Sequence, residues 1–204
     1  MESLLLATRS RGKLVELRSL LAPLVRRLLT LDDVGIAASE AEDALERFET
    51  FEENALSKAR HFAQVSALPT VADDSGLEVL ALGGKPGVHS KRWSGSTAPD
   101  GPELEGVNRQ KLLQQMQGTR DRRARFVCVA AYVNGSREVI VRGETTGVIL
   151  ERERGSRGFG YDSLFLSDDL GRTLAECSVE EKERVSHRGR AFGMLAERLV
   201  GGLT

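Results

Sequence analysis

A β-hairpin is the feature of this sequence that most constrains its fold. The apolar, β-rich residues 126–133 are followed by Asn134-Gly135-Ser136 and then by a second β-rich run at 138–141. Asn-Gly between two such runs favours a tight turn, because both residue types tolerate the positive φ that short hairpin turns require. A hairpin joins antiparallel strands, so the predicted sheet cannot be purely parallel.

Strands and helices alternate along the rest of the chain. Residues 4–7 form an apolar strand, and a polar loop at 8–13 separates this strand from a helix with leucines at helical spacing, at 14, 17, 20, 21 and 24. The same patterns predict helices at 51–66, 103–117 and 190–200, a short helix after the capping box at 178–181, and strands at 28–37, 71–77, 145–150 and 164–166. We expect the acidic stretch 40–49 to be a solvated loop or the start of a helix. The pattern predicts one α/β domain over residues 1–204, with a mixed twisted sheet flanked by helices.

Composition excludes several classes of protein. The 204 residues include 29 basic and 30 acidic side chains, a formal net charge of −1, which gives no general attraction to nucleic acid or anionic membranes. Two distant cysteines, Cys128 and Cys177, are too few for a disulfide framework or a cysteine metal site. The first residues lack the pattern of a signal peptide, so we expect a cytoplasmic protein.

Two adjacent carboxylates, Asp73 and Asp74, stand in the segment Val71-Ala72-Asp73-Asp74-Ser75-Gly76-Leu77. We expect a strand that ends here in a turn. Because side chains alternate along a strand, the two acids share one cleft only if the strand has ended, and otherwise one acid works while the other supports it. Paired acids suit Mg²⁺, which takes carboxylates and substrate phosphates as ligands. The alternative is an ordinary turn, since all four residue types from Asp73 to Gly76 are turn formers.

Other polar groups are individually weak signals for a nucleotide site. The basic loop 8–13 precedes a helix, where backbone N–H groups attract anions, although such loops are often only solvated. Glu53 lies in the first turn of a helix, where acids also occur simply because they complement the dipole. Lys182, Ser186, His187 and Arg188 are expected in a donor-rich loop, and Phe159 and Tyr161 lie between glycines; a solvated loop and core aromatics are the alternatives. Together these groups are the components of a nucleotide site.

Five ordered motifs resemble those of the Ham1-like inosine/xanthosine triphosphate pyrophosphatases, over nearly the whole chain. They are Ala7-Thr8-Arg9-Ser10-Arg11-Gly12-Lys13, Phe51-Glu52-Glu53-Asn54-Ala55-Leu56-Ser57-Lys58-Ala59, Ala72-Asp73-Asp74-Ser75-Gly76-Leu77, Gly158-Phe159-Gly160-Tyr161-Asp162 and Ser186-His187-Arg188-Gly189-Arg190-Ala191. The resemblance implies an elongated fold, bilobed around a central cleft, and usually a homodimer. It implies Mg²⁺-dependent hydrolysis of ITP, dITP or XTP to the monophosphate and pyrophosphate.

The resemblance also assigns residues. Asp74 is the expected general base, and Asp74, Asp73 and Glu53 are the expected metal-associated acids. The residues expected along the substrate phosphates are Thr8, Arg9, Ser10, Arg11, Gly12, Lys13, Asn54, Lys58 and Ser75. Those expected at the base are Phe159, Gly160, Tyr161, Asp162, Lys182, His187 and Arg188.

Two residues depart from the family pattern. Ser10 replaces the usual asparagine, and Ser163 replaces the proline that usually follows the Tyr-Asp pair. The first change removes the two-ended reach of an amide, and the second frees a backbone φ angle. Two other hypotheses therefore stay open at this point: a nucleotide sensor without turnover, and a phosphatase or kinase that acts on the terminal phosphate.

Overall fold

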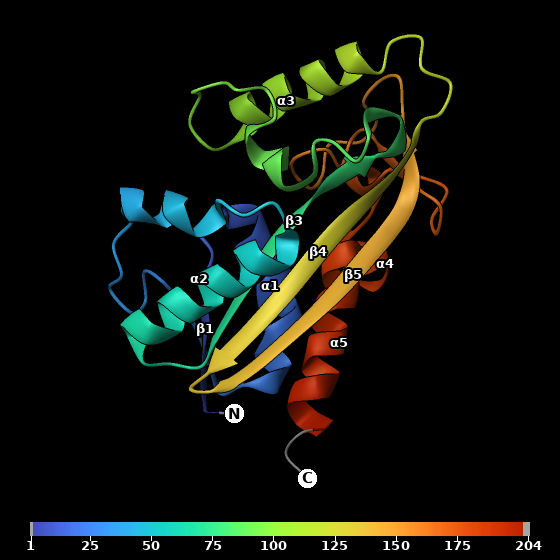
Figure 1. Cartoon of the computed structure of the whole chain (residues 1–204). Helices are drawn as coiled ribbons and strands as arrows, with labels where there is room; N and C mark the ends of the chain where they lie inside the picture. The colour runs from blue at the N-terminus through green and yellow to red at the C-terminus, as the bar shows by residue number, and fades with distance from the viewer. Residues whose placement is uncertain (1, 202–204) are drawn as a thin grey trace. The chain divides into compact units, whose positions relative to one another are not determined.

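The computed structural model describes residues 2–201, which form a six-stranded sheet in the order β2-β1-β3-β4-β5-β6 together with five α-helices (Figure 1). The strands are β1 (Ser3–Leu6), β2 (Arg27–Thr30), β3 (Thr70–Val79), β4 (Arg123–Asn134), β5 (Arg137–Ile149) and β6 (Phe165–Ser167). β1 pairs in parallel with β2 and β3, whereas β5 and β6 are antiparallel. Only Gly135 and Ser136 separate β4 from β5, and Gly135 has a φ of 57°. The predicted hairpin and mixed sheet are confirmed.

The helices begin and end close to the predicted positions. They are α1 (Arg11–Leu21), α2 (Phe51–Ser66), α3 (Pro102–Gln115), α4 (Val179–Val185) and α5 (His187–Gly201). Short 3₁₀ turns are η1 (Ala22–Leu24), η2 (Glu40–Glu46), η3 (Leu80–Leu82), η4 (Gly87–Arg92) and η5 (Leu174–Glu176). Among residues 2–201, no helix combines the length and the apolar character that a membrane crossing requires.

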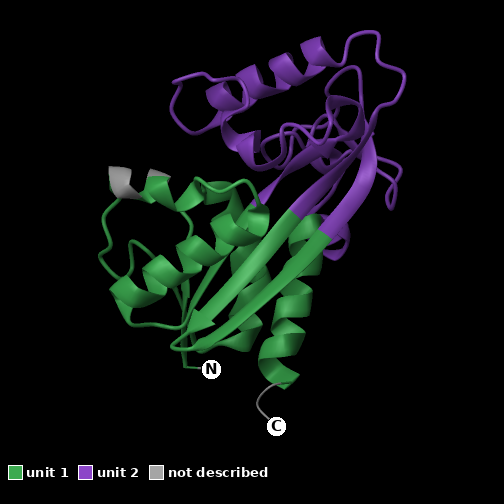
Figure 2. Ribbon diagram, in the orientation of Figure 1, with its two compact units in different colours: residues 1–74, 128–143, 187–204 green, residues 75–127, 144–186 purple. Residues whose placement is uncertain are grey.

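The chain forms two compact units (Figure 2). Unit 1 comprises residues 1–74, 128–143 and 187–204, and unit 2 comprises residues 75–127 and 144–186. Three of the four boundaries fall within the strands β3, β4 and β5, and the fourth falls between α4 and α5. Each unit is thus assembled from segments that are distant in sequence. That the whole chain behaves as one domain stays a prediction.

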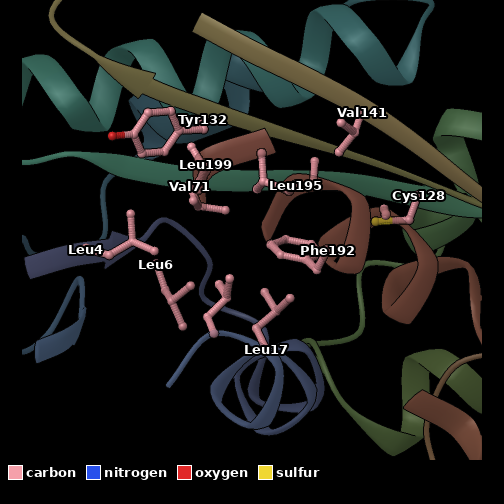
Figure 3. Packing of buried hydrophobic residues seen from close by; sticks show 13 residues of the cluster. Leu4, Leu6, Leu17, Val71, Cys128, Tyr132, Val141, Phe192, Leu195 and Leu199 are labelled. Atoms are coloured by element: carbon pink, nitrogen blue, oxygen red, sulfur yellow. The ribbon is translucent and has the colours of Figure 1, made fainter. Parts of the chain in front are cut away.

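The core of unit 1 shows how strand alternation places side chains (Figure 3). Alternate residues of the strands meet apolar residues of α1 and α5 in one buried cluster: Leu4, Leu6, Val71, Cys128, Ala130, Tyr132 and Val141 from the strands, with Leu17, Leu21, Phe192 and Leu195 from the helices. Val71 lies two positions before Asp73, so both side chains belong to the same face of β3. Asp74 belongs to the opposite face.

A separate cluster forms the core of unit 2. α3 contributes Leu112, the end of β3 contributes Leu77 and Val79, and Phe126 of β4 packs against Phe165 with ring centroids 4.7 Å apart. Tyr161 is part of this cluster, which ties the loop at 157–162 to the interior of the unit.

The predicted turn at Asp73-Asp74-Ser75-Gly76 is wrong, because β3 continues through it to Val79. Each carboxylate finds partners on its own face of the strand, so no turn is needed to accommodate the pair. Gly76 is needed for another reason: a Cβ there would lie 2.2 Å from the main-chain oxygen of Gly87. The glycine allows the η4 segment to approach the strand closely.

Other boundaries also differ from the predictions. The strand predicted at 28–37 is shorter, because β2 spans only Arg27–Thr30. The predicted strands at 138–141 and 145–150 are one strand, β5, in which a Cβ at Gly143 would lie 2.4 Å from the main-chain oxygen of His187. We expected the strand to break at this glycine. Gly143 instead lies within β5 and allows α5 to approach the strand closely. α5 begins at His187, three residues before the predicted start, so His187 and Arg188 lie in a first helical turn and not in a loop. Lys182, expected in the same loop, lies in α4.

Candidate active site

The polar loop after β1 leads into the N-terminus of α1. Ser10 is the N-cap of α1, and its hydroxyl accepts a hydrogen bond from the backbone N–H of Lys13 at 3.4 Å. The Thr8 hydroxyl in turn accepts from the N–H of Ser10 at 3.2 Å. Serine caps helices about as well as the asparagine usual in the family, so this departure preserves the start of the helix. The helix dipole makes this end favourable for an anion.

Asp73 is a buried carboxylate surrounded by donors. Its Oδ2 lies 3.0 Å from Lys13 Nζ and 3.5 Å from Arg188 Nε, and Cys128 Sγ donates to the same oxygen at 3.7 Å. Burial would raise the pKa of Asp73, but the charges of Lys13, Arg188 and Lys58 outweigh burial and hold the pKa well below its usual range. The other oxygen, Oδ1, is buried and has no hydrogen-bond partner among residues 2–201. Asp73 therefore remains charged and orients two cations.

Asp74 faces α2, where it meets a different set of partners. Asn54 Nδ2 donates to Asp74 Oδ2 at 3.1 Å, and Lys58 Nζ lies 3.5 Å from Oδ1. Burial raises the pKa of Asp74, and the opposing charges of Lys58 and Lys13 do not cancel this effect. The neighbouring acids thus have pKa values displaced in opposite directions. This is the arrangement expected of one supporting carboxylate and one that exchanges protons.

Asn54 and Lys58 hold the acid pair in place. The Asn54 amide also exchanges hydrogen bonds with the backbone of Phe48, at 3.0 and 3.1 Å. Lys58 Nζ donates to the main-chain oxygen of Asp73 at 2.7 Å and to the carboxylate of Glu46. Although burial would lower the pKa of Lys58, the charges of Asp74, Glu46 and Asp73 raise it. Lys58 therefore stays protonated, and the phosphate contacts of Asn54 and Lys58 stay predictions.

Sequence reasoning missed Glu46. This residue ends η2 within the acidic stretch that we interpreted as a solvated loop or helix start, and its carboxylate pairs with Lys58. Its charge also acts on Asp74 and raises the pKa of that group. An acid at the end of a charged run carries no distinguishing pattern, so only the structure places it beside Lys58.

Glu53 occupies a different environment from the two aspartates. Its side chain is exposed and accepts a hydrogen bond from the hydroxyl of Thr50, the N-cap of α2, at 2.7 Å. Within residues 2–201, no three histidine, cysteine, aspartate or glutamate side chains gather so that they could hold a metal ion. The expected cluster of Asp73, Asp74 and Glu53 is therefore not assembled in this structure. Here Glu53 stabilises the start of α2.

The remaining residues of the basic loop differ from Lys13. Arg9, for which we predicted a phosphate contact, instead binds Glu42 at 2.8 Å, Asp32 at 3.3 Å and the main-chain oxygen of Ile36 at 2.9 Å. This side chain fastens the segment between β2 and η2. Arg11 is exposed at the first position of α1, and Gly12 follows it half-buried. Lys13 is the basic side chain of the loop that reaches the acid pair.

Arg188 is one of the most buried charged residues of unit 1. Its guanidinium pairs with Glu16 of α1 at 2.5 Å and with Asp73 at 3.5 Å, and its exposed fraction is 2%. Glu16 is a second residue that sequence reasoning missed, although it lies one helical turn after Lys13. His187 is buried beside Arg188 in the first turn of α5. The structure places both residues with the acid pair in unit 1, and their predicted contacts with a base stay predictions.

The other predicted base-binding residues belong to unit 2. Asp162 Oδ2 accepts hydrogen bonds from the backbone N–H of Phe159 at 2.8 Å and from Lys182 Nζ at 2.6 Å. Lys182 Nζ also lies over the Phe159 ring, 5.0 Å from its centroid. A Cβ at Gly158 would lie 2.1 Å from Asp162 Oδ2, so only glycine allows this closed loop. An aromatic ring, a cation and a carboxylate are thereby brought together.

Tyr161 and Ser75 complete the predicted set. The Tyr161 hydroxyl donates to the main-chain oxygen of Ser90 at 2.9 Å, and burial raises the pKa of this phenol. Tyr161 is thus a structural residue that anchors the loop, as our core-aromatic alternative stated. Ser75 follows Asp74 directly in β3 and is half-buried.

Known proteins resemble this chain along nearly its whole length. The sequence profile described as Ham1 family matches residues 4–198. A dITP/XTP pyrophosphatase of Mycolicibacterium paratuberculosis is 47% identical over 205 residues, with 98% of this chain and 96% of that protein covered. A dITP/XTP pyrophosphatase of Escherichia coli is 42% identical over 207 residues, with 99% and 100% covered.

A solved structure is similar to this chain in both sequence and fold. The structure of a HAM1 protein from Coxiella burnetii superposes with a TM-score of 0.84 at 36% identity, and the match covers 98% of this chain and 100% of that one. Both the sequence and the mixed six-stranded fold are therefore shared along essentially the full length. This chain belongs to the Ham1 family.

Proposed function

We propose that this chain is a dITP/XTP pyrophosphatase, a hydrolase that removes non-canonical purine nucleoside triphosphates from the nucleotide pool. ITP, dITP and XTP are cleaved between the α- and β-phosphates, which gives the monophosphate and pyrophosphate. The observation that carries the proposal is the pair of adjacent aspartates on β3. One of them is held ionised by Lys13 and Arg188, and the other, with a raised pKa, faces Asn54 and Lys58.

Two carboxylates near Lys58 are the candidates for holding Mg²⁺. Asp74 and Glu46 both pair with the Lys58 ammonium, and Mg²⁺ typically takes one or two carboxylates together with phosphate oxygens. These two residues would hold the ion together with the substrate, while the roles of Asp73 and Glu53 in metal binding stay predictions. When bound, Mg²⁺ neutralises phosphate charge and so lowers the repulsion of an approaching nucleophile.

Lysine side chains of the protein also neutralise phosphate charge. Lys13, at the N-terminus of α1, and Lys58 supply positive charge for the triphosphate, and the dipole of α1 adds to it. Asp74 accepts a proton from the attacking water, because burial favours its protonated form while a bound Mg²⁺ would oppose that shift, so the group would stay ionised yet basic. The proton moves to Asp74, the new P–O bond forms, and pyrophosphate leaves.

Selectivity for the base follows from hydrogen-bond donors. A 6-oxo purine presents an acceptor at position 6, whereas adenine presents a donor there, so protein donors are satisfied only by the former. Each unsatisfied buried donor costs about 1–3 kcal/mol, and two such mismatches give roughly 10³-fold discrimination. We propose that Lys182 and Asp162 read the base while Phe159 stacks on it.

Product analysis tests the proposal. The purified protein is incubated with Mg²⁺ and ITP, dITP, XTP or ATP, and pyrophosphate and orthophosphate are measured separately. We expect pyrophosphate from the first three and little from ATP. Orthophosphate alone would indicate an enzyme that acts on the terminal phosphate, and binding without release of either product would indicate a sensor.

Three further parts of the hypothesis come from the family resemblance. They are a bilobed arrangement around a central cleft, a homodimer and a cytoplasmic location. All three stay predictions, and sedimentation of the purified protein tests the second.

A further inference from the structure

Both backbone polar groups of Gly160 are bound by side chains of α3. The carboxylate of Glu105 accepts a hydrogen bond from the N–H of Gly160 at 2.9 Å. Arg109 Nη1 donates to the main-chain oxygen of the same residue, also at 2.9 Å. Glu105 and Arg109 are four residues apart on one face of α3, with 3.9 Å between their charged groups. We call these two residues the α3 clamp.

The clamp extends to a residue in which this chain departs from its family. Arg109 Nε lies 2.9 Å from the carboxylate of Glu153, and the Ser163 hydroxyl donates to that same carboxylate at 2.7 Å. The hydroxyl is available only because serine stands where the family usually has proline. Glu153 therefore connects Ser163 to Arg109, and Arg109 connects both to Gly160. A hydrogen bond and an ion pair thus stand where the family's proline would restrict the backbone φ angle.

The α3 clamp acts on the segment that we assign to the base. Gly160 has a φ of 62°, in the left-handed region. Because glycine has no side chain, only its backbone groups can hold it in this position. Its neighbours carry the recognition groups: Phe159 before it, and Asp162, bound to Lys182, after it. Asp162 holds the loop internally, through the N–H of Phe159, and Tyr161 binds it to Ser90 of η4. The clamp supplies the contact from α3.

We propose that Glu105 and Arg109 are positioning residues for base recognition, a role that rests on the proposed function. By holding both polar groups of Gly160, they set the position of the Phe159 ring and of the Asp162 carboxylate. Recognition sites tolerate displacements of only about 0.5 Å, so a loosened loop weakens contacts with the base. Both residues belong to unit 2, whereas the acid pair belongs to unit 1. Loss of the clamp therefore raises KM for ITP and lowers the preference over ATP, with little change in kcat.

Graded variants of α3 test this role. Glu105→Ala and Arg109→Ala each remove one contact with Gly160, and we expect KM for ITP to rise about tenfold, the size expected for a charge-assisted hydrogen bond. Glu105→Gln keeps an acceptor oxygen and is expected to recover most of the loss. Ser163→Ala removes only the outer contact, so we expect a rise of about two- to threefold. Glu103→Gln, at an exposed position of the same helix, is the matched control and is expected to resemble the parent chain.

Two readouts that do not require turnover accompany the kinetics. Hydrogen exchange of the Gly160 amide is expected to accelerate in Glu105→Ala and to be slow again in Glu105→Gln, and the dissociation constant of IMP is expected to rise with KM. Faster exchange with unchanged IMP binding and unchanged KM would overturn the proposal, as would equal losses in Glu105→Gln and Glu105→Ala or a fall confined to kcat. If the parent chain released no pyrophosphate from ITP, the proposed function would fail, while exchange and IMP binding would still decide the role of the clamp.

Discussion

The acid pair of unit 1 and the aromatic loop of unit 2 are held in different ways. Around Asp73 and Asp74, side chains of α1, α2 and α5 pair with carboxylates on a regular strand, and the exposed fractions of Asp73 and Arg188 are both 2%. Around Phe159 and Gly160, by contrast, side chains bind the backbone of an irregular loop. The first region depends on opposite charges that compensate one another, and the second depends on the shape of the main chain.

This difference indicates how each region responds to substitution. Removing the Asp73 charge leaves Lys13 and Arg188 uncompensated, so the penalty appears in stability, whereas burial disfavours the charge of Asp74 and its removal is expected to affect activity. Removing one backbone contact loosens a loop, and the penalty then appears mainly in substrate affinity. The predictions below test this division.

The largest effect is expected from Asp74→Asn. The amide preserves the shape of the side chain but cannot accept the proton of the attacking water, so we expect kcat with ITP to fall about 10²- to 10⁴-fold with KM little changed. Because burial disfavours the charge on Asp74, the variant is not expected to lose stability at pH 7. Steady-state kinetics and urea unfolding measure the two quantities. Turnover equal to that of the parent chain would exclude Asp74 as the base.

Asp73→Asn is expected to act mainly on stability. It removes the carboxylate that compensates Lys13 and Arg188, and breaking a buried ion pair costs about 3 kcal/mol or more in the free energy of unfolding. Urea unfolding at pH 7 measures the loss, with Asp74→Asn as the neighbouring control. Equal stability of the two variants would contradict the distinction between a supporting and a working acid.

A smaller effect is expected from Phe159→Leu in the second region. The substitution keeps an apolar side chain but removes the flat face on which a base stacks, and stacking on an aromatic ring contributes about 1–3 kcal/mol per base. We expect KM for ITP to rise about tenfold, with kcat and the free energy of unfolding nearly unchanged. A fall in kcat with unchanged KM would contradict this prediction, because it would indicate that Phe159 contributes to the chemical step and not to binding of the base.

The smallest effect concerns pH. Because the pKa of Asp73 is lower in the folded chain than in the unfolded chain, the stability that this group contributes is complete above the unfolded value of about 4 and is lost as the pH falls below it. The difference in stability between the parent chain and Asp73→Asn should therefore shrink by at most about 1.4 kcal/mol for each pH unit below that value. Urea unfolding from pH 7 to pH 3 measures it, and a constant difference would show that Asp73 is not specifically stabilised as an anion.

Sequence patterns predicted the elements that depend on local signals. The bounds of α2 agree at both ends, because Thr50 caps one end and the apolar stripe runs to the other, where Ala67 takes a left-handed conformation. The hairpin between β4 and β5 follows from Asn134-Gly135 for a similar reason. Local chemistry alone is sufficient in both cases.

Long-range contacts decided the elements that were predicted incorrectly. Turn-forming residues at 73–76 remain in β3 because α1, α2 and α5 supply partners to both carboxylates, and η4 approaches Gly76. Likewise, β5 passes through Gly143 because α5 approaches it there. Nothing in the sequence distinguishes Glu16 or Glu46 from other acids. Glu16 pairs with Arg188, 172 residues away, and Glu46 pairs with Lys58, which belongs to a different helical element.

The class of fold and the family could be predicted from the sequence alone, because they depend on periodicity, turn chemistry and the order of motifs. Only the tertiary structure decided which acid is paired with which cation and why Asp73 and Asp74 differ. The pKa of a carboxylate depends on burial and on charges within a few ångströms, and these neighbours come from helices that the sequence does not place relative to β3. The same holds for Glu105 and Arg109, whose contacts with Gly160 span more than 50 residues.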